Sequence, residues 1–142
     1  MGWEPIIYKH RSFDLNNQLI SWLQKYMEIF FLSYNHPFWF NEVLADLHGN
    51  FHVPHGKYFF DEDIIGDDQE RLTYCLDMID LTIEKIKSTS KREFFNTIRE
   101  SLKESWCDIS NTFYNQEWLD DDKGFRETYI ETLTKLKEIM QE

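Results

Sequence analysis

The chain is poor in the residues that build disulfide frameworks, tight turns and phosphate-binding loops. It contains two cysteines, three prolines and five glycines among 142 residues. Cys75 and Cys107 each lie within an apolar helical pattern, where a free cysteine usually behaves as a small buried hydrophobe. The glycines are scattered singly, so no glycine-rich phosphate loop is present. These shortages disfavour a disulfide scaffold and a nucleotide-binding loop.

Long apolar runs and catalytic motifs are missing as well. The longest apolar run, around residues 29–32, is far shorter than the roughly 20 residues of a membrane-spanning helix. Residues 1–10 contain no apolar stretch typical of a signal peptide, which predicts a cytoplasmic protein. The chain has neither a GxSxG nucleophile motif nor an HExxH zinc-protease motif. We therefore expect neither a membrane protein nor an enzyme.

Positive charge is scarce, because 15 Lys and Arg face 26 Asp and Glu and leave a net charge of −11. Such a charge repels nucleic acids and anionic lipids, so we expect neither as a partner. Rings are abundant instead, with five Trp, seven Tyr and twelve Phe. A hydrophobic content of 42% is ordinary for a folded domain. The composition favours a globular protein that binds something basic.

Apolar residues recur at three- and four-residue steps through most of the chain, which is the spacing of amphipathic helices. Ser90 and Glu93 also have the spacing of a capping box. Residues 1–13 are expected to be irregular, with a short strand at 6–8 as an alternative, and residues 49–66 to form one long irregular loop. The prediction is an all-α, single-domain bundle over residues 1–142. Its five helices run from an Asp14 cap to His36, from Pro37 to Gly49, from an Asp67 or Asp68 cap to Lys87, from Ser90 to Phe113, and from the acidic turn at 120–122 to Met140.

Two acidic runs, each preceded by aromatic residues, form the candidate partner-binding site. An aromatic ring supplies contact area for an interface, and flanking carboxylates steer a basic partner. Acids at helix starts also cap backbone N–H groups, so solvated capping runs are the alternative, with aromatics that merely cover the ends of the bundle. The candidate residues are Tyr58, Phe59, Asp61, Glu62, Asp63, Asp67, Asp68, Trp118, Asp120, Asp121 and Asp122.

Three histidines, His48, His52 and His55, cluster in the segment HGNFHVPH. Imidazole is a common zinc ligand, so a metal-binding or small-ligand site is the alternative function of the chain. Gly49 stands where a zinc protease has its glutamate, and Gly49 and Pro54 are expected to interrupt a helix here. Histidines packed against aromatic rings explain the cluster more simply, and we expect no cofactor.

A small, acidic, aromatic-rich helical chain without a catalytic motif resembles the immunity proteins of bacterial toxin systems, such as contact-dependent inhibition and polymorphic toxin systems. The resemblance rests on size, charge and composition over the whole chain, and it carries no residue roles. It implies a protein that binds and neutralises a cognate basic toxin domain, often a nuclease, by occluding the active site with acidic and aromatic residues. Self-association through exposed aromatic residues is a third alternative, and a homo-oligomer stays open.

Overall fold

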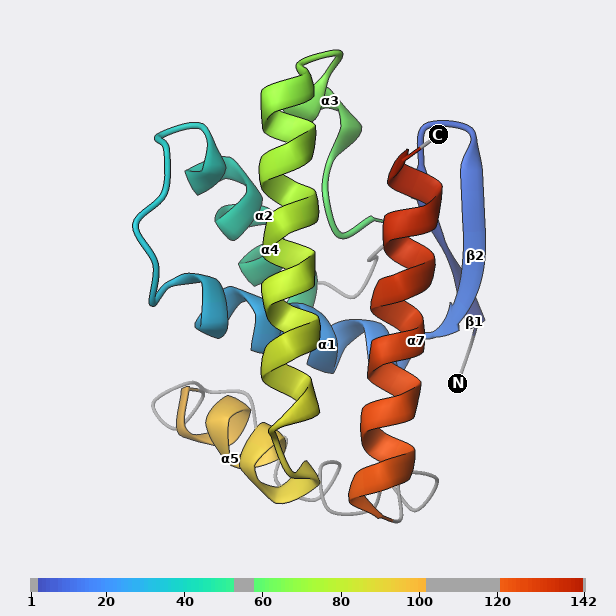
Figure 1. The fold of residues 1–142 in the computed structure, drawn as a ribbon, viewed down its shortest axis with the longest axis vertical. Helices are drawn as coiled ribbons and strands as arrows, with labels where there is room; N and C mark the ends of the chain where they lie inside the picture. The colour runs from blue at the N-terminus through green and yellow to red at the C-terminus, as the bar shows by residue number, and fades with distance from the viewer. Residues whose placement is uncertain (1–2, 53–57, 102–120, 142) are drawn as a thin grey trace.

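The computed structural model describes residues 3–52, 58–101 and 121–141, and most of them are helical (Figure 1). A two-stranded antiparallel sheet precedes the helices, so the chain is mostly helical rather than all-α. The described elements are β1 (Trp3–Tyr8), β2 (Arg11–Asn16), α1 (Asn17–Phe31), α2 (Phe40–His52), α3 (Glu62–Ile65), α4 (Gln69–Lys87), α5 (Lys91–Ser101) and α7 (Asp122–Gln141).

Helices α4 and α7 lie side by side along the long axis of the molecule, and α1 lies across them (Figure 1). α2 packs on α1, the β1–β2 hairpin lies beside α7, and α5 contacts α1 and α7 near one end. The short helix α3 lies at the opposite end, beside the start of α4 (Figure 1). At ~1.5 Å per residue α4 spans about 28 Å, so elements at its two ends are well separated.

The N-terminal segment is a β-hairpin and not the irregular stretch expected for residues 1–13, although the alternative strand at 6–8 falls within β1. β1 pairs with β2 along its full length. Side chains alternate along β1, so Ile6 and Tyr8 are buried while Ile7 faces outward. The apolar spacing of the sequence did not indicate the hairpin, because Leu15 of β2 also fits the helical spacing that follows it.

The limits of the first helix differ from those predicted. α1 begins at Asn17 and ends at Phe31, whereas the apolar spacing predicted a helix from Asp14 to His36. Asp14 cannot cap α1, because it lies within β2 and pairs with β1. Strand pairing therefore overrides the local helical pattern at this end.

α1 is buried on nearly all sides and not along a single stripe. Between residues 19 and 28 only Ser21 is part-exposed. The polar side chains of Lys25 and Glu28 are buried there as an ion pair, with Nζ and Oε1 2.8 Å apart. Gln24 is also buried, and its Nε2 donates to the Tyr58 carbonyl at 2.9 Å. Partners of this kind compensate buried polar groups for their lost hydration.

A cluster of aromatic rings joins three helices. Phe94 of α5 stacks on Tyr26 of α1 with ring centroids 4.4 Å apart, and its centroid lies 4.9 Å from Phe125 and 4.8 Å from Tyr129, both of α7. Offset and edge-to-face contacts of this kind add stability beyond the burial of area. The apolar residues that recur at helical spacing through α7 are all buried, as that spacing predicts: Phe125, Tyr129, Leu133, Leu136 and Met140.

The second helix and the loop after it also differ from the predictions. α2 begins at Phe40 instead of Pro37, and it runs through Gly49 to His52, so Gly49 does not end it. Of the loop predicted for residues 49–66, residues 49–52 belong to α2 and residues 62–65 form α3, while residues 53–57 lie outside the described structure. A glycine at an exposed position of a helix is tolerated when the helix is stabilised by packing elsewhere.

Two predicted helix starts are confirmed. Asp68 caps α4, because its carboxylate accepts from the backbone N–H groups of Glu70 at 2.9 Å and Arg71 at 3.2 Å. Ser90 and Glu93 form the capping box before and within α5: Ser90 Oγ accepts from Glu93 N–H at 3.1 Å, and the Glu93 carboxylate accepts from Ser90 N–H at 3.0 Å. Caps depend on a few neighbouring residues, so local sequence is enough to identify them.

We expect Asp68→Ala to lower the free energy of unfolding by about 1 kcal/mol, because backbone N–H groups in the first turn of α4 lose their acceptor. Asp67→Ala is the matched control, since the Asp67 side chain is fully exposed and caps no helix. Urea unfolding followed by circular dichroism measures both variants. Equal losses of stability would contradict the capping role of Asp68.

Candidate functional site

The first acidic run lies where α3 meets the start of α4, on an apolar base. Ile64 and Ile65 of α3 are buried, and so are Phe59 and Phe60 just before it. The acids of the same segment therefore face outward. We call them the acidic ridge: Asp61, Glu62, Asp63, Asp67 and Asp68.

Three carboxylates of the acidic ridge hold the fold. Asp68 caps α4, and Asp61 caps α3 by accepting from the backbone N–H of Asp63 at 2.9 Å. The Glu62 carboxylate accepts from the backbone N–H of Lys9 in the hairpin turn, where Lys9 has a left-handed φ of 55°. These contacts tie the acidic ridge to the hairpin and to α4.

The other two carboxylates of the acidic ridge contribute little to the fold. Within the described residues, the Asp63 side chain forms no ion pair or hydrogen bond. Asp67 makes one long contact, with its Oδ1 3.8 Å from Lys9 Nζ, and is otherwise fully exposed. An exposed ion pair at that distance adds almost nothing to stability. Asp63 and Asp67 are thus available to a partner.

A hollow of about 260 Å³ lies beside the acidic ridge. Ile7 of β1 and Tyr58 line it together with Asp61, Glu62 and Asp63. Among the described residues, those that line it supply an aliphatic side chain, an aromatic ring and three carboxylates, but no Lys or Arg. This combination fits a long cationic side chain, whose stem packs on apolar groups while its charged end meets acids.

Asp46 of α2 adds negative charge next to the hollow. Burial raises the pKa of Asp46, and the charges of Asp61 and Glu42 raise it further. Burial also raises the pKa of Tyr58, followed by the charges of Asp46, Asp61 and Asp63. Within the described part of the chain, the buried Oδ2 of Asp46 has no hydrogen-bond partner. Carboxylates are therefore held together here at an electrostatic cost.

The second acidic run lies at the other end of the molecule. Asp121 Oδ1 accepts from the backbone N–H of Gly124 at 2.6 Å, and Asp122 Oδ1 accepts from that of Lys91 at 2.9 Å. Lys91 begins α5, just after α4 ends, whereas the acidic ridge lies where α4 begins (Figure 1). A single small contact surface does not cover both ends of α4.

The aromatic residues of the predicted site differ in their availability. Tyr58 is half-buried and lines the hollow. Phe59 is 1% exposed and belongs to the core, which corrects the prediction that it fills a pocket of the partner. Trp118 and Asp120 lie outside the described residues, and their roles stay predictions.

His48 lies beside the buried ion pair of α1. Its Nδ1 is 3.2 Å from Glu28 Oε2 and 3.4 Å from Lys25 Nζ. The nearby ammonium opposes binding of a metal cation at this nitrogen. No group of three or more potential metal ligands occurs within residues 3–52, 58–101 and 121–141.

The structure does not test whether the other two histidines, His52 and His55, form a metal site. The helix was expected to be interrupted at Gly49, but α2 continues through it. His52 therefore belongs to α2, four positions after His48. The side chain of His52 and all of His55 lie outside the described structure. A metal or small-ligand site in this segment therefore stays a prediction.

The sequence did not indicate Ile7 and Asp46 as part of the site. Ile7 reaches it through strand pairing and Asp46 through the packing of α2, and both depend on contacts between distant segments. One local signal was present for Ile7. In a strand at 3–8, side chains alternate, so Ile7 lies on the face of the strand opposite to the one that carries the buried Ile6 and Tyr8. No comparable local signal distinguishes Asp46 from other helical acids.

No protein family, curated protein or solved structure matches this chain. Among the helices that the structure describes, none combines the length and the apolar content needed to cross a membrane.

Asp46→Asn is expected to stabilise the protein at neutral pH, because it removes a carboxylate whose charged form is disfavoured by burial and by Asp61 and Glu42. A raised pKa means that the folded state binds the proton more tightly than the unfolded chain does. The wild-type protein should therefore regain stability relative to the variant as the pH falls from the raised pKa toward the ordinary value of 3.8.

Melting temperatures of both proteins at neutral pH and at about pH 4 measure this effect. Asp77→Asn is the control, since Asp77 is exposed and forms no ion pair within the described residues. A stabilisation by Asp46→Asn that is equally large at both pH values would show that the charge of Asp46 is not its cause.

Proposed function

We propose that this protein binds a basic protein through the acidic ridge and the hollow beside it. The hollow carries the proposal, because Ile7, Tyr58 and three carboxylates line it, and no basic side chain of the residues that the structure describes does so. The partner that fits best is a toxin domain, in particular a nuclease, whose active-site groove is basic because it binds phosphates. The protein would act as an immunity protein that occludes this groove.

The way in which the acidic ridge is held supports this function. α3 is capped by Asp61, anchored by buried residues and tied to the hairpin through Glu62, so its carboxylates are positioned before a partner arrives. A preorganised surface loses less conformational entropy on binding than a mobile one. The acidic ridge lies at one end of the molecule (Figure 1), where it can enter a groove on the partner.

Electrostatics supports the same function in two ways. The net charge of −11 steers a basic partner toward the protein and raises the association rate. Close to the hollow, Asp46, Asp61 and Asp63 crowd negative charge that a partner's Lys or Arg would neutralise. A ligand that relieves repulsion in the folded state also stabilises that state.

The first experiment is to isolate the partner. The protein is immobilised, a lysate of the native host is passed over it at low salt, and the retained proteins are identified by mass spectrometry. The most abundant basic protein is then purified for kinetic and inhibition measurements. If no basic protein is retained in proportion to the bait, the proposed function is wrong.

We expect Asp63→Lys combined with Asp67→Lys to slow association with this partner by about tenfold or more at low salt, because exposed interface charges act chiefly on the association rate. Inhibition of the partner's activity should weaken accordingly. Neither residue caps a helix, so the variant should fold normally.

Glu131→Lys combined with Glu138→Lys is the matched control, since it changes the net charge equally on an exposed face of α7. Surface plasmon resonance at low and moderate salt compares the two variants with the wild-type protein. If both variants slow association equally, net charge alone governs binding and the acidic ridge is not the contact site.

A further inference from the structure

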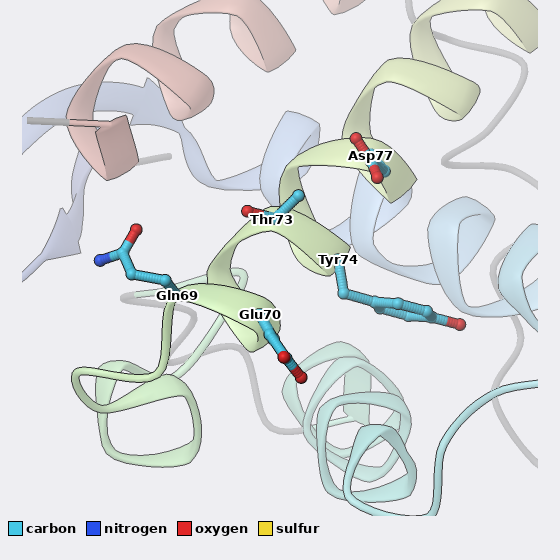
Figure 2. A pocket seen from close by; sticks show the side chains of 5 residues that line it. All are labelled: Gln69, Glu70, Thr73, Tyr74 and Asp77. Atoms are coloured by element: carbon cyan, nitrogen blue, oxygen red, sulfur yellow. The ribbon is translucent and has the colours of Figure 1, made fainter.

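A second hollow, of about 400 Å³, lies on the outer side of α4 and is called the α4 groove here. Five residues of α4 line it: Gln69, Glu70, Thr73, Tyr74 and Asp77. Figure 2 shows their side chains along the helix, with Glu70 and Asp77 on either side of Tyr74. Steps of four and three residues place these three side chains in one stripe of a helix.

The two carboxylates of this stripe are free to act on a ligand. Within the described residues neither Glu70 nor Asp77 forms an ion pair or a side-chain hydrogen bond. An aromatic ring between two carboxylates is a good receptor for a cation, which meets the ring face and the acids together. The chain already contains an arginine on a ring nearby, since Arg71 Cζ lies 5.0 Å from the centroid of Trp39.

Large exposed apolar side chains are gathered in a segment whose His36 and Trp39 contact Tyr74 of the α4 groove. They belong to Leu32, Tyr34 and Phe38, which lie in the connection between α1 and α2, and we call them the apolar shelf. Phe38 is 89% exposed and Leu32 is 61% exposed, unusually high values for large apolar side chains. Apolar side chains gathered in one exposed segment mark interaction sites more often than isolated ones do.

Contacts with Tyr74 hold the apolar shelf next to the α4 groove. His36 Nε2 lies 2.6 Å from the Phe31 carbonyl, and its Nδ1 is hydrogen-bonded to the Tyr74 hydroxyl. The Trp39 and Tyr74 rings pack in a T-shaped arrangement with centroids 5.5 Å apart. Tyr74 thus lines the α4 groove and also fixes the connection that carries Phe38.

Charge decides what kind of occupant fits this combined surface. A second copy of this chain would bring another −11 charge toward Glu70 and Asp77, so like charges oppose self-association here. Nucleic acids and anionic lipids are opposed for the same reason. A segment that carries both cationic and apolar side chains matches the α4 groove and the apolar shelf together.

We propose that the α4 groove and the apolar shelf dock an amphipathic basic segment of the partner, with a Lys or Arg over Tyr74 between the two carboxylates and an apolar side chain on Phe38. This inference rests on the proposed function, in that the segment belongs to the same basic partner. The α4 groove begins at Gln69, directly after Asp68 of the acidic ridge, so one partner can cover both surfaces.

Two synthetic peptides test the docking surface without the partner. One repeats Arg and Leu at helical spacing, and the other has Ser in place of every Leu and carries the same charge. Titration of the ¹⁵N-labelled full-length protein with each peptide, followed by NMR, gives the affinity and the amides that shift. We expect the Arg–Leu peptide to bind about tenfold more tightly than the Arg–Ser peptide and to shift amides in residues 32–39 and 69–77.

Two variants distinguish specific binding at this surface from nonspecific binding to exposed aromatic residues. Phe38→Ser should weaken the Arg–Leu peptide about tenfold, while Trp3→Ser, which removes another exposed ring at 69% exposure, should leave its affinity unchanged. Equal affinities for the two peptides, or equal effects of the two variants, would overturn the inference. Shifts in residues 32–39 that grow with protein concentration in the absence of peptide would also overturn it, because a second copy would then be the occupant.

The failure of this inference can be distinguished from the failure of the proposed function. Asp63→Lys with Asp67→Lys should slow binding of the whole partner yet leave the ratio of the affinities for the equally charged Arg–Leu and Arg–Ser peptides within about twofold of its wild-type value, since neither residue lines the α4 groove. A partner that responds to the acidic ridge but not to Phe38→Ser would refute the docking surface alone.

Discussion

The burial of α1 is the constraint on which the rest of the structure depends. α2, α4, α5 and β2 all contact this helix, so each must turn an apolar face toward it. Its own Lys25 is tolerated in the interior only because Glu28 neutralises it at 2.8 Å. With the faces around α1 committed to the core, most acids of the described residues lie at the ends and outer sides of the helices.

The carboxylates at the surface have two different roles. Asp61, Asp68 and Asp121 satisfy backbone N–H groups at helix starts, and the local structure would change without them. Asp63 and Asp67 lie in the same short segment but contribute almost nothing to the fold. The number of acidic residues in the sequence does not show which carboxylates cap helices and which do not. The distinction matters for function, because only the second group can be given to a partner without loss of stability.

Much of the helical framework could be predicted from the sequence, including the cap at Asp68, the capping box at Ser90 and the buried face of α7. The hairpin could not, because Asp14 and Leu15 satisfy the helical spacing and only their pairing with β1 decides otherwise. The first acidic run was identified as a candidate site, but the burial of Phe59 and the participation of Ile7 were not. Both properties depend on which side of a segment packs against the core, and the sequence pattern does not determine that side.

The sequence by itself determined the predominance of helices, the capping box of Ser90 and Glu93 and the strongly negative charge, since each follows from neighbouring residues or from composition. Tertiary structure alone decided that the two acidic runs lie at opposite ends of α4 and that Ile7 and Tyr58 form a hollow with the acidic ridge. It likewise decided that Phe38 stays exposed while Phe40 is buried. The physical reason is the same in every case: these properties arise from contacts between segments far apart in the chain, which local preferences do not encode.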